Sequence, residues 1–506
     1  MPTSVKTILL GGLFFSSSIL TAAETPPDKT VPAATVNATV PYTGPWRWFD
    51  EARFGVFIHY GPQSAEFNKL YQEWPKQTVA PDYEFSKYGQ PTKYGKYQDL
   101  MAASFNPDKF DAKKIVHQVQ SVGARYLIFT SVHHDTYCLW DTKTSEHKVT
   151  NSKSRRDICA ELYAACQEAK LPLFWYFGPA RDDWCVLDGK DIPGLKPEYQ
   201  VEVKPGEKID PARHVAQIMK LRGALVRELM EKFPKIAGFW WDMGPPAEMQ
   251  NWQWYAKEYN RPDIVMNGQM YNNSMVASGE GGANLNVKRD CRKEAALSPG
   301  NGRWFWTSPN NSDFAVRPGH NPLANTVKEL VYYAGRDVNC VLNIAPDPSG
   351  EYEPNVVQGM EIFGAWMKKH GHTIYGTRGG PFFVNTSGCG WIKMEGGGLQ
   401  NGMGNYDTVL DAKGRPGTEV TSTCKGNTIF LHVLNWNNRD TLPLPPIPAK
   451  IIKHEVLTGG TATVEQTDAG VKVSVPKDQR DAVDTIISLT LDREAFSVQP
   501  VFGLKE

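Results

Sequence analysis

The sequence predicts an α/β protein in which a (β/α)8 TIM-like barrel is followed by a small antiparallel β-sandwich. Short segments that are apolar at nearly every position recur along the first two thirds of the 506-residue chain, as strands covered on both faces do. Longer amphipathic segments separate them, and this alternation is typical of a parallel sheet with helices outside it. Beyond about residue 385 the pattern changes to β-branched runs broken by Gly, Asn and Pro, which indicates a second, all-β domain.

Seven apolar segments are predicted to be barrel strands, and an eighth is placed near residues 374–384. The seven are residues 53–61, 125–135, 171–179, 237–244, 263–270, 303–308 and 339–346. Two amphipathic helices are predicted at residues 111–122 and 211–233, where apolar side chains recur on one stripe. No glycine-rich phosphate-binding fingerprint follows the first strand, which argues against a dinucleotide-binding sheet.

The N-terminal residues are predicted to direct export. Residues 1–23 combine one lysine, an apolar run and a small-residue cleavage site, which is the pattern of a secretory signal peptide. Residues 24–45, rich in Pro, Thr and Ala, are predicted to be a linker. The barrel domain is then residues 46–384 and the β-sandwich residues 385–506. We therefore expect an exported protein, periplasmic or extracellular, with no membrane association once the signal is removed.

The charge balance points to a neutral or small binding partner. Lys and Arg together number 55, Asp and Glu together also number 55, and no basic or acidic block stands out. This balance argues against a nucleic acid or a membrane surface as the partner. The chain has eight cysteines, without Cys-x-x-Cys spacing, so we expect mostly buried thiols and no zinc site.

Polar residues stand at the carboxyl ends of three predicted strands. Asp242 follows a run of apolar residues, and His59 ends the first strand. His133 and His134 end the second strand. Because the strands of a barrel are parallel, these side chains are expected at one rim, where barrel enzymes place their chemistry. Each has a structural alternative, since Asp242 could cap a turn and either histidine could be a strand-end residue. A metal site that also uses Asp135 is not expected, because adjacent side chains on a strand diverge.

Six segments carry a resemblance to a known family when they are taken together. They are WFDEARFGVFIHYG (48–61), Glu73-Trp74, FNPDKFDA (105–112), the strand that ends in His133-His134-Asp135, WWDMG (240–244) and VNCVLNIAPDPSG (338–350). With them the chain resembles the α-L-fucosidases of glycoside hydrolase family 29, from about residue 48 to its end. That family has a catalytic barrel followed by a β-sandwich, in agreement with the pattern-based prediction.

The resemblance implies an exo-glycosidase that removes terminal α-L-fucosyl, or closely related L-sugar, residues from oligosaccharides or polysaccharides with retention of configuration. By the family's Trp-x-Asp motif, Asp242 is the nucleophile. The residues that correspond to the family's sugar-binding groups are His59, Glu73, His133 and His134, with Trp74 and Tyr176 as wall and hydrogen-bond partners. A retaining mechanism pairs the nucleophile with a protonated carboxyl group about 5 to 5.5 Å away, and it requires no metal or organic cofactor.

The second carboxyl group is where this chain departs from the family pattern. Many members carry the acid/base Glu in a Trp-Glu pair where this chain has Trp-Phe at residues 304–305, and in another branch the Glu aligns with Asn311. Glu280, in a Gly-rich segment, is the first candidate to replace it, and Glu294 and Asp313 are alternatives; each could instead be a solvated charge. Otherwise the natural leaving group departs unaided, or the protein is a catalytically weak or inactive glycan-binding relative.

Overall fold

The computed structural model describes most of the chain from residue 41 onward. The described residues are 41–64, 102–179, 186–188, 197–199, 201–203, 211–242, 244–268, 275–280, 292–297, 304–307, 312–383, 391–393, 399–401, 420–436 and 438–502. The predicted signal peptide, most of the predicted linker and the Glu73-Trp74 pair lie outside these ranges.

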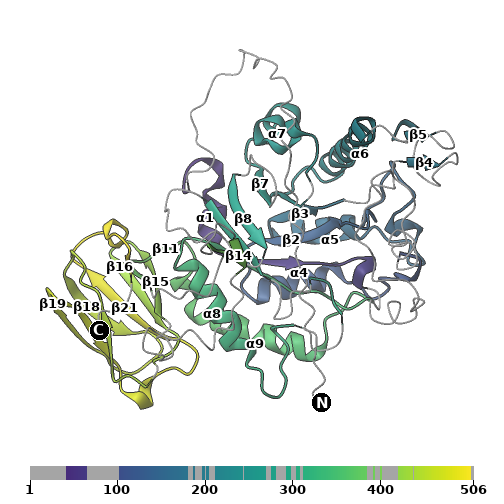
Figure 1. Ribbon diagram of the computed structural model, residues 1–506. Coiled ribbons are helices and arrows are strands. Elements are labelled where there is room, and N and C mark those ends of the chain that lie inside the picture. The colour runs from purple at the N-terminus through teal and green to yellow at the C-terminus, as the bar shows by residue number, and fades with distance from the viewer. Residues whose placement is uncertain are drawn as a thin grey trace, which may run out of the picture. The chain divides into compact units, whose positions relative to one another are not determined.

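Eight parallel strands form the sheet that carries the candidate site (Figure 1). In chain order they are β1 (Phe54–Ile58), β2 (Leu127–Val132), β3 (Leu173–Phe177), β6 (Gly238–Trp241), β7 (Val265–Gly268), β8 (Val276–Glu280), β9 (Arg292–Leu297) and β10 (Asn339–Asn343). Their order in the sheet is β7-β6-β3-β2-β1-β10-β9-β8, and every neighbouring pair is parallel. The edge strands β7 and β8 contact each other, so the sheet curls as a barrel does. The predicted fold class is thus confirmed.

Helices separate the strands of this sheet along the chain. They are α1 (Arg47–Ala52), α4 (Ala112–Ser121), α5 (Ile158–Ala169), α6 (Pro211–Lys232), α7 (Trp252–Tyr259), α8 (Pro322–Ala334) and α9 (Pro354–His370). Side-chain caps define several helix starts: Asp111 accepts a hydrogen bond from the backbone N–H of Lys114 at 3.0 Å, and Asp157 accepts one from that of Ala160 at 2.9 Å. The two helices predicted at residues 111–122 and 211–233 correspond to α4 and α6.

Two predicted strands were wrong, and two real strands were missed. The described part of the predicted strand 303–308 is not a strand. Residues 374–384 supply β11 (Arg378–Gly379) and β12 (Phe382–Phe383), which belong to other sheets than the barrel. The strands that complete the barrel are instead β8 and β9, whose sequences VASGE and RKEAAL are too polar to resemble buried strands. Two polar residues of β9 have partners inside the protein: the Arg292 Nε atom lies 2.9 Å from the Asp50 Oδ1 atom, and Glu294 accepts hydrogen bonds from neutral side chains.

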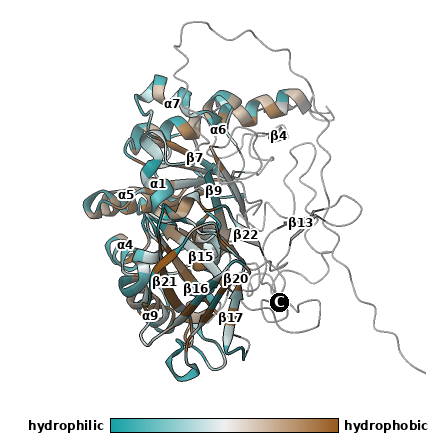
Figure 2. Ribbon diagram, turned by 90° about the vertical axis from the view of Figure 1, so that its left-hand side faces the viewer, coloured by the Kyte–Doolittle hydropathy of each residue, from teal (hydrophilic) through white to brown (hydrophobic). Residues whose placement is uncertain are grey.

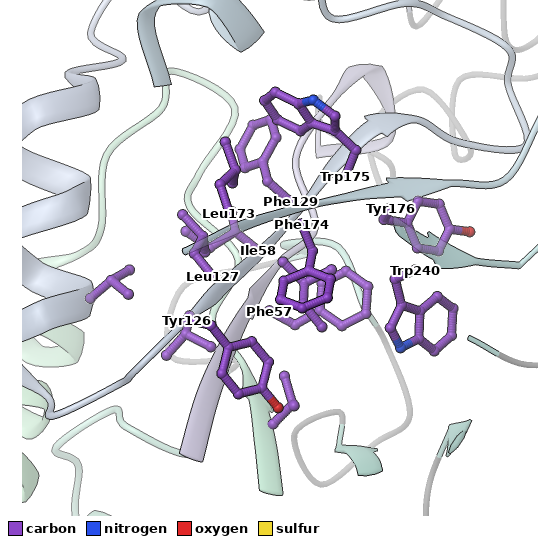
Figure 3. Packing of buried hydrophobic residues seen from close by; sticks show 14 of the residues in the cluster. Phe57, Ile58, Tyr126, Leu127, Phe129, Leu173, Phe174, Trp175, Tyr176 and Trp240 are labelled. Atoms are coloured by element: carbon purple, nitrogen blue, oxygen red, sulfur yellow. The ribbon is translucent and has the colours of Figure 1, made fainter. Parts of the chain in front are cut away.

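Successive side chains of β3 point to opposite faces of the sheet (Figure 3). Phe174 and Tyr176 of β3 lie with Phe57, Tyr126 and Trp240 on one face, while Leu173 and Trp175 lie on the other with Leu127 and Phe129. On the first face, the Tyr176 and Trp240 rings stack with centroids 5.5 Å apart and an interplanar angle of 17°. These aromatic side chains therefore fill the barrel interior directly below the ends of β3 and β6.

The C-terminal part of the chain is built from shorter sheets, most of them antiparallel. One contains β11, β15 (Val420–Lys425), β16 (Thr428–Val433), β21 (Thr485–Leu491) and β18 (Ile451–Val456), and another contains β17 (Thr441–Leu444), β20 (Gly470–Ser474) and β19 (Thr463–Thr467). Short pairs join β12 to β22 (Val501–Phe502) and β13 (Trp391–Lys393) to β14 (Leu399–Asn401). A further short pair, β4 (Val186–Asp188) with β5 (Val201–Val203), lies outside this part, between β3 and α6 along the chain. The central strands β16 and β21 are apolar (Figure 2), and their side chains contribute to a second hydrophobic core. The domain boundary at residue 385 stays a prediction.

Two further features of the described residues concern predictions made from composition. Five cysteines, Cys138, Cys159, Cys166, Cys340 and Cys424, are buried free thiols. Among the helices that the structure describes, none combines the length and the apolar character that crossing a membrane requires.

Candidate active site

Asp242 lies one residue beyond β6, at the carboxyl end of the barrel. Its backbone N–H donates to the Phe177 carbonyl at 3.1 Å, which continues the pairing of β6 with β3 by one residue. Its side chain is buried, with 7% of the residue exposed. The Tyr176 hydroxyl donates to the Asp242 Oδ2 atom at 2.6 Å, and the His134 Nε2 atom lies 2.9 Å from the same oxygen. The carboxylate is therefore held in one orientation by a residue of β3 and a residue of the turn that follows β2.

A tight turn brings both adjacent histidines to this site. The Thr136 N–H donates to the His133 carbonyl at 2.8 Å, and Thr136 adopts a left-handed backbone with φ of 59°. The imidazoles of His133 and His134 consequently lie with centroids 4.4 Å apart. The Asp135 carboxylate instead accepts a hydrogen bond from the backbone N–H of Tyr137 at 3.1 Å. The divergence expected for neighbours on a strand thus does not apply, because the strand has already ended at Val132.

His59 follows β1 directly and is the most deeply buried of the three histidines, at 1% exposure. Its Nδ1 atom lies 2.8 Å from the Oδ1 atom of Asn343, the last residue of β10. Its ring packs against Phe57, with centroids 4.1 Å apart, and against Trp304, at 4.9 Å. Burial among these aromatic rings lowers the pKa of His59 to about 3, so its imidazole is neutral at physiological pH.

His133 lies beside His59, with ring centroids 5.9 Å apart. It stacks on Tyr176 at a centroid distance of 5.1 Å and an angle of 12°, and its Nδ1 atom lies 3.0 Å from the amide nitrogen of Gln63. Burial, followed by the neighbouring His134 and His59, lowers the pKa of His133 well below its ordinary value. Two neutral imidazoles at one strand-end rim can donate to and accept from hydroxyl groups without adding charge.

Two aromatic residues cover these imidazoles. Trp304 and Phe305 come from the segment that was predicted to be a strand. The Phe305 ring meets His133 edge-on at 4.8 Å and His59 edge-on at 5.4 Å. The position where many relatives are expected to carry an acidic residue is therefore occupied by an apolar wall, with Phe305 8% exposed.

The three candidates for the second carboxyl group lie at different depths. Glu280 is the last residue of β8 and pairs in register with Ala296 of β9, so it stands at the same end of the barrel as Asp242. Glu294 pairs with Ser278, two residues before the end of β8, and it is fully buried. Asp313 is half-buried in the segment before α8, where its carbonyl lies 2.9 Å from the His320 Nε2 atom.

Glu294 is surrounded by uncharged hydrogen-bond donors inside the barrel. Its Oε2 atom accepts from the Tyr126 hydroxyl at 2.6 Å. Its Oε1 atom accepts from the Asn267 Nδ2 atom at 2.6 Å and from the Trp240 Nε1 atom at 3.1 Å. Burial nevertheless raises the pKa of Glu294 to about 7, because three neutral donors do not replace the lost hydration fully.

A group of ligand atoms from His133, His134 and Asp242 lies within 4.8 Å of one another, close enough for a metal ion. This group differs from the one weighed from the sequence, since Asp242 replaces Asp135. The His134 Nε2 atom already lies at hydrogen-bond distance from the Asp242 Oδ2 atom. The family resemblance implies sugar binding and nucleophilic attack for the same three residues, and the mechanism proposed below uses them in these roles.

The structure therefore places Asp242, His59, His133, His134 and Tyr176 together, whereas Glu73 and Trp74 lie outside the described residues. Sequence reasoning missed two residues that hold the histidines, Gln63 and Asn343. Asn343 had a signal, because it is a polar residue at the carboxyl end of an apolar strand, as Asp242 and His59 are. Gln63 had none, since it lies in a single 3-10 turn (Pro62–Ser64) with no recognisable sequence pattern.

Comparison with known proteins relates the chain to one family of enzymes. A sequence model of the family described as alpha-L-fucosidase matches residues 29–372. The plasma alpha-L-fucosidase of Homo sapiens is 24% identical over 354 residues, which are 65% of this chain and 69% of that protein. A solved family 29 alpha-L-fucosidase from Bacteroides thetaiotaomicron matches with a TM-score of 0.63 at 20% identity, over 90% of this chain and 96% of that chain. Another structure from that organism, a trapped covalent intermediate in complex with 2-fluoro-fucosyl fluoride, gives 0.61 at 19% identity, over 89% and 97%. These solved structures share the fold.

Proposed function

Because the chain belongs to the alpha-L-fucosidase family of glycoside hydrolases, we propose that it is an exported retaining exo-glycosidase acting on terminal α-L-fucosyl, or closely related L-sugar, residues of glycans. The observation that carries this proposal is the setting of Asp242. A buried carboxylate at the end of a barrel strand is held by a tyrosine hydroxyl and an imidazole, next to two neutral imidazoles and an aromatic wall. This combination suits attack on a sugar whose hydroxyls are bound by uncharged groups.

In the proposed mechanism, Asp242 attacks the anomeric carbon. A bond forms between that carbon and a carboxylate oxygen, while the bond from the carbon to the leaving oxygen breaks. Water then attacks the same carbon and releases Asp242, so two inversions give net retention. The covalent intermediate trapped in the Bacteroides thetaiotaomicron fucosidase supports a two-step course for this chain. Tyr176 and His134 orient the carboxylate throughout by their hydrogen bonds to Oδ2.

Glu280 is proposed to protonate the leaving oxygen and then to take a proton from the attacking water. Its support is positional, because it ends a strand at the rim that also holds Asp242. Glu294 has a pKa that would suit an acid, but its position argues against that role. It is fully buried and two residues deeper than the end of the neighbouring strand, with both oxygens bonded to protein donors.

Turnover of an activated aryl α-L-fucoside tests the role of Asp242. We expect Asp242→Ala to lose turnover and added azide to restore it, with a glycosyl azide of inverted configuration as the product. Asp242→Asn is the matched control, because it keeps the side-chain volume and leaves less room for azide. Absence of turnover by the wild type, with L-fucose binding preserved, would instead favour a glycan-binding relative.

The residue that protonates the leaving oxygen can be identified by comparing the activity of variants on substrates with good and poor leaving groups. Glu280→Gln is expected to fail on a poor, alkyl leaving group while it retains most activity on an activated aryl fucoside, since only the poor leaving group needs protonation. Losing general-acid help typically costs about 10²- to 10⁴-fold. Glu294→Gln and Asp313→Asn are the controls and should treat the two substrates alike. If either control shows the selective loss and Glu280→Gln does not, the assignment moves to that residue.

Export is proposed from the sequence of residues 1–23. Expression of the full chain in a bacterial host should place the protein outside the cytoplasm, with a mature N-terminus at Glu24 by N-terminal sequencing. Retention of the intact N-terminus in the cytoplasm would contradict this part of the proposal.

A further inference from the structure

His59 and His133 differ in the ring nitrogen that carries the proton. In a neutral imidazole one nitrogen donates and the other accepts, and the hydrogen bond made by one nitrogen decides the role of the other. Each of these two histidines has a side-chain amide at its Nδ1 atom, but the two amides present opposite ends. The site is therefore expected to hold one imidazole in each tautomer.

The tautomer of His59 follows from the orientation of Asn343. The Asn343 Nδ2 atom donates to the backbone carbonyl of Trp304 at 2.6 Å, and a carbonyl only accepts. The other end of the amide, Oδ1, consequently faces His59 at 2.8 Å and must accept as well. His59 therefore carries its proton on Nδ1, and its remaining nitrogen, Nε2, is a hydrogen-bond acceptor.

The tautomer of His133 is the opposite. The Gln63 Nε2 atom, which can only donate, lies 3.0 Å from the His133 Nδ1 atom. His133 Nδ1 therefore accepts, and the proton resides on its Nε2 atom. Both rings stay neutral near pH 7, because burial lowers both pKa values. His133 thus offers a donor where His59 offers an acceptor.

We propose that Gln63 and Asn343 are positioning residues that lock these opposite tautomers, so that His59 and His133 together select a sugar hydroxyl that donates to one ring and accepts from the other. The inference rests on the proposed function, because it assigns the two imidazoles to the same bound sugar. Their ring centroids are 5.9 Å apart, so both imidazoles are close enough to contact the same bound sugar. Tyr176 and Phe305 contact both rings and fix their mutual orientation.

The two fixed tautomers have a consequence for substrate specificity. A hydroxyl group can satisfy both imidazoles at once, but a fluorine atom cannot donate to His59. An analogue with fluorine at the selected position would leave the buried Nε2 atom of His59 without a donor. An unsatisfied buried acceptor weakens binding by about 10- to 100-fold. Fluorine at the other hydroxyl positions should weaken binding less, because those positions do not bind to these two imidazoles.

The first test reads the tautomers directly in the wild-type protein. Histidine labelled with ¹⁵N distinguishes a protonated ring nitrogen from an unprotonated one by its chemical shift. We expect His59 protonated at Nδ1 and His133 protonated at Nε2. Gln63→Glu replaces the donor by an acceptor of nearly the same shape, and it should move the His133 proton to Nδ1. Gln63→Met, which neither donates nor accepts, is the control for packing. The same tautomer in both wild-type histidines would overturn the inference.

The second test measures binding of L-fucose and its monodeoxyfluoro analogues by calorimetry. One analogue should bind the wild type about 10- to 100-fold more weakly than fucose. Asn343→Leu, which frees His59 to exchange tautomers, should reduce that penalty, and Gln63→Glu should weaken fucose binding more than Gln63→Met does. Equal effects of these two Gln63 variants would indicate a merely structural role. If the two tautomers are as stated but fucose does not bind, the proposed function is wrong and the assignment of tautomers holds. If the enzyme turns over fucosides with other tautomers, only the assignment of tautomers is wrong.

Discussion

Asp242 and Glu294 are two buried acids of one barrel, and they differ in depth and in the groups that surround them. Asp242 lies beyond the end of a strand, 7% exposed, with His134 and Tyr176 on one oxygen. Glu294 lies within a strand, 0% exposed, with three neutral donors shared between both oxygens. The two are linked, because Trp240 donates to Glu294 and stacks on Tyr176, which donates to Asp242.

A raised pKa does not by itself identify a catalytic acid. A strongly shifted pKa in a cleft is a sign of function, but burial in a structural network shifts a pKa as well. Glu294 has the shift, with a pKa of about 7, and lies in the barrel interior. Asp242 has the position at the rim. We infer that Glu294 supports the stack of Trp240 on Tyr176, whereas Asp242 reacts.

The sharpest way to break this distinction is to neutralise each acid in turn. Asp242→Asn should lower kcat/KM on an aryl α-L-fucoside by about 10⁴-fold or more, as removal of a nucleophile does in other enzymes. Glu294→Gln keeps the shape and one accepting oxygen, so it should stay within about tenfold of the wild type. Steady-state kinetics at one pH measures both. The reverse order of the two losses would contradict the assignment of roles.

Truncating the same two acids should reverse the order when stability is measured. Glu294→Ala leaves the donors of Tyr126, Trp240 and Asn267 without their acceptor and opens a cavity, which together should lower the free energy of unfolding by about 3 to 5 kcal/mol. Asp242→Ala, at the rim, should cost less than about 2 kcal/mol, because residues that serve catalysis often contribute little to stability. Urea unfolding of the two variants measures the difference. Equal losses of unfolding free energy in the two variants would mean that the depth of an acid in the barrel does not determine its contribution to stability.

The two acids also illustrate which parts of the fold and of the site could be predicted from the sequence. Asp242, His59, His133 and His134 were predicted to converge because apolar strands that end in polar residues were recognisable, and parallel strands present their ends at one rim. The sequence left open that Glu294 is a solvated charge, because RKEAAL has the composition of an exposed segment. Its burial depends on partners that are distant in sequence, such as Tyr126, 168 residues away.

Residues 303–308 show the reverse case, because they are apolar and were predicted to be a strand, but their described part is not a strand. Phe305 is buried and Trp304 partly buried, but they cover the imidazoles of His59 and His133 instead of joining the sheet. Apolar composition indicates burial and does not distinguish a strand from the wall of a site. The side-chain amides of Gln63 and Asn343 depend likewise on tertiary neighbours, since only the folded chain shows which amide end faces which histidine.

The pH dependence of stability sharpens the comparison further. The pKa of Glu294 rises from an ordinary value of 4.5 to about 7 in the folded protein. The folded chain therefore holds this proton over an interval in which the unfolded chain has lost it. The stability that Glu294 contributes is complete below about pH 4.5 and is lost as pH rises through 7, by about 3 kcal/mol in total. Urea unfolding of wild type and Glu294→Gln from pH 4.5 to 8 should show a fall that the variant lacks. Parallel curves would show that Glu294 does not titrate in this range.

The smallest expected effect comes from removing a single donor to Glu294. Tyr126→Phe deletes the hydroxyl that lies 2.6 Å from the Oε2 atom and leaves the ring in place. A hydrogen bond to an ionised group is worth about 1.5 to 3 kcal/mol, and one between neutral groups about 1 kcal/mol. The loss of stability should therefore be greater at pH 8, where Glu294 is ionised, than at pH 5, where it is protonated. Glu294→Gln supplies the control background, in which Tyr126→Phe should cost the same at both pH values. A cost that does not depend on pH in either background would place the Tyr126 hydroxyl outside the interactions that stabilise the charge.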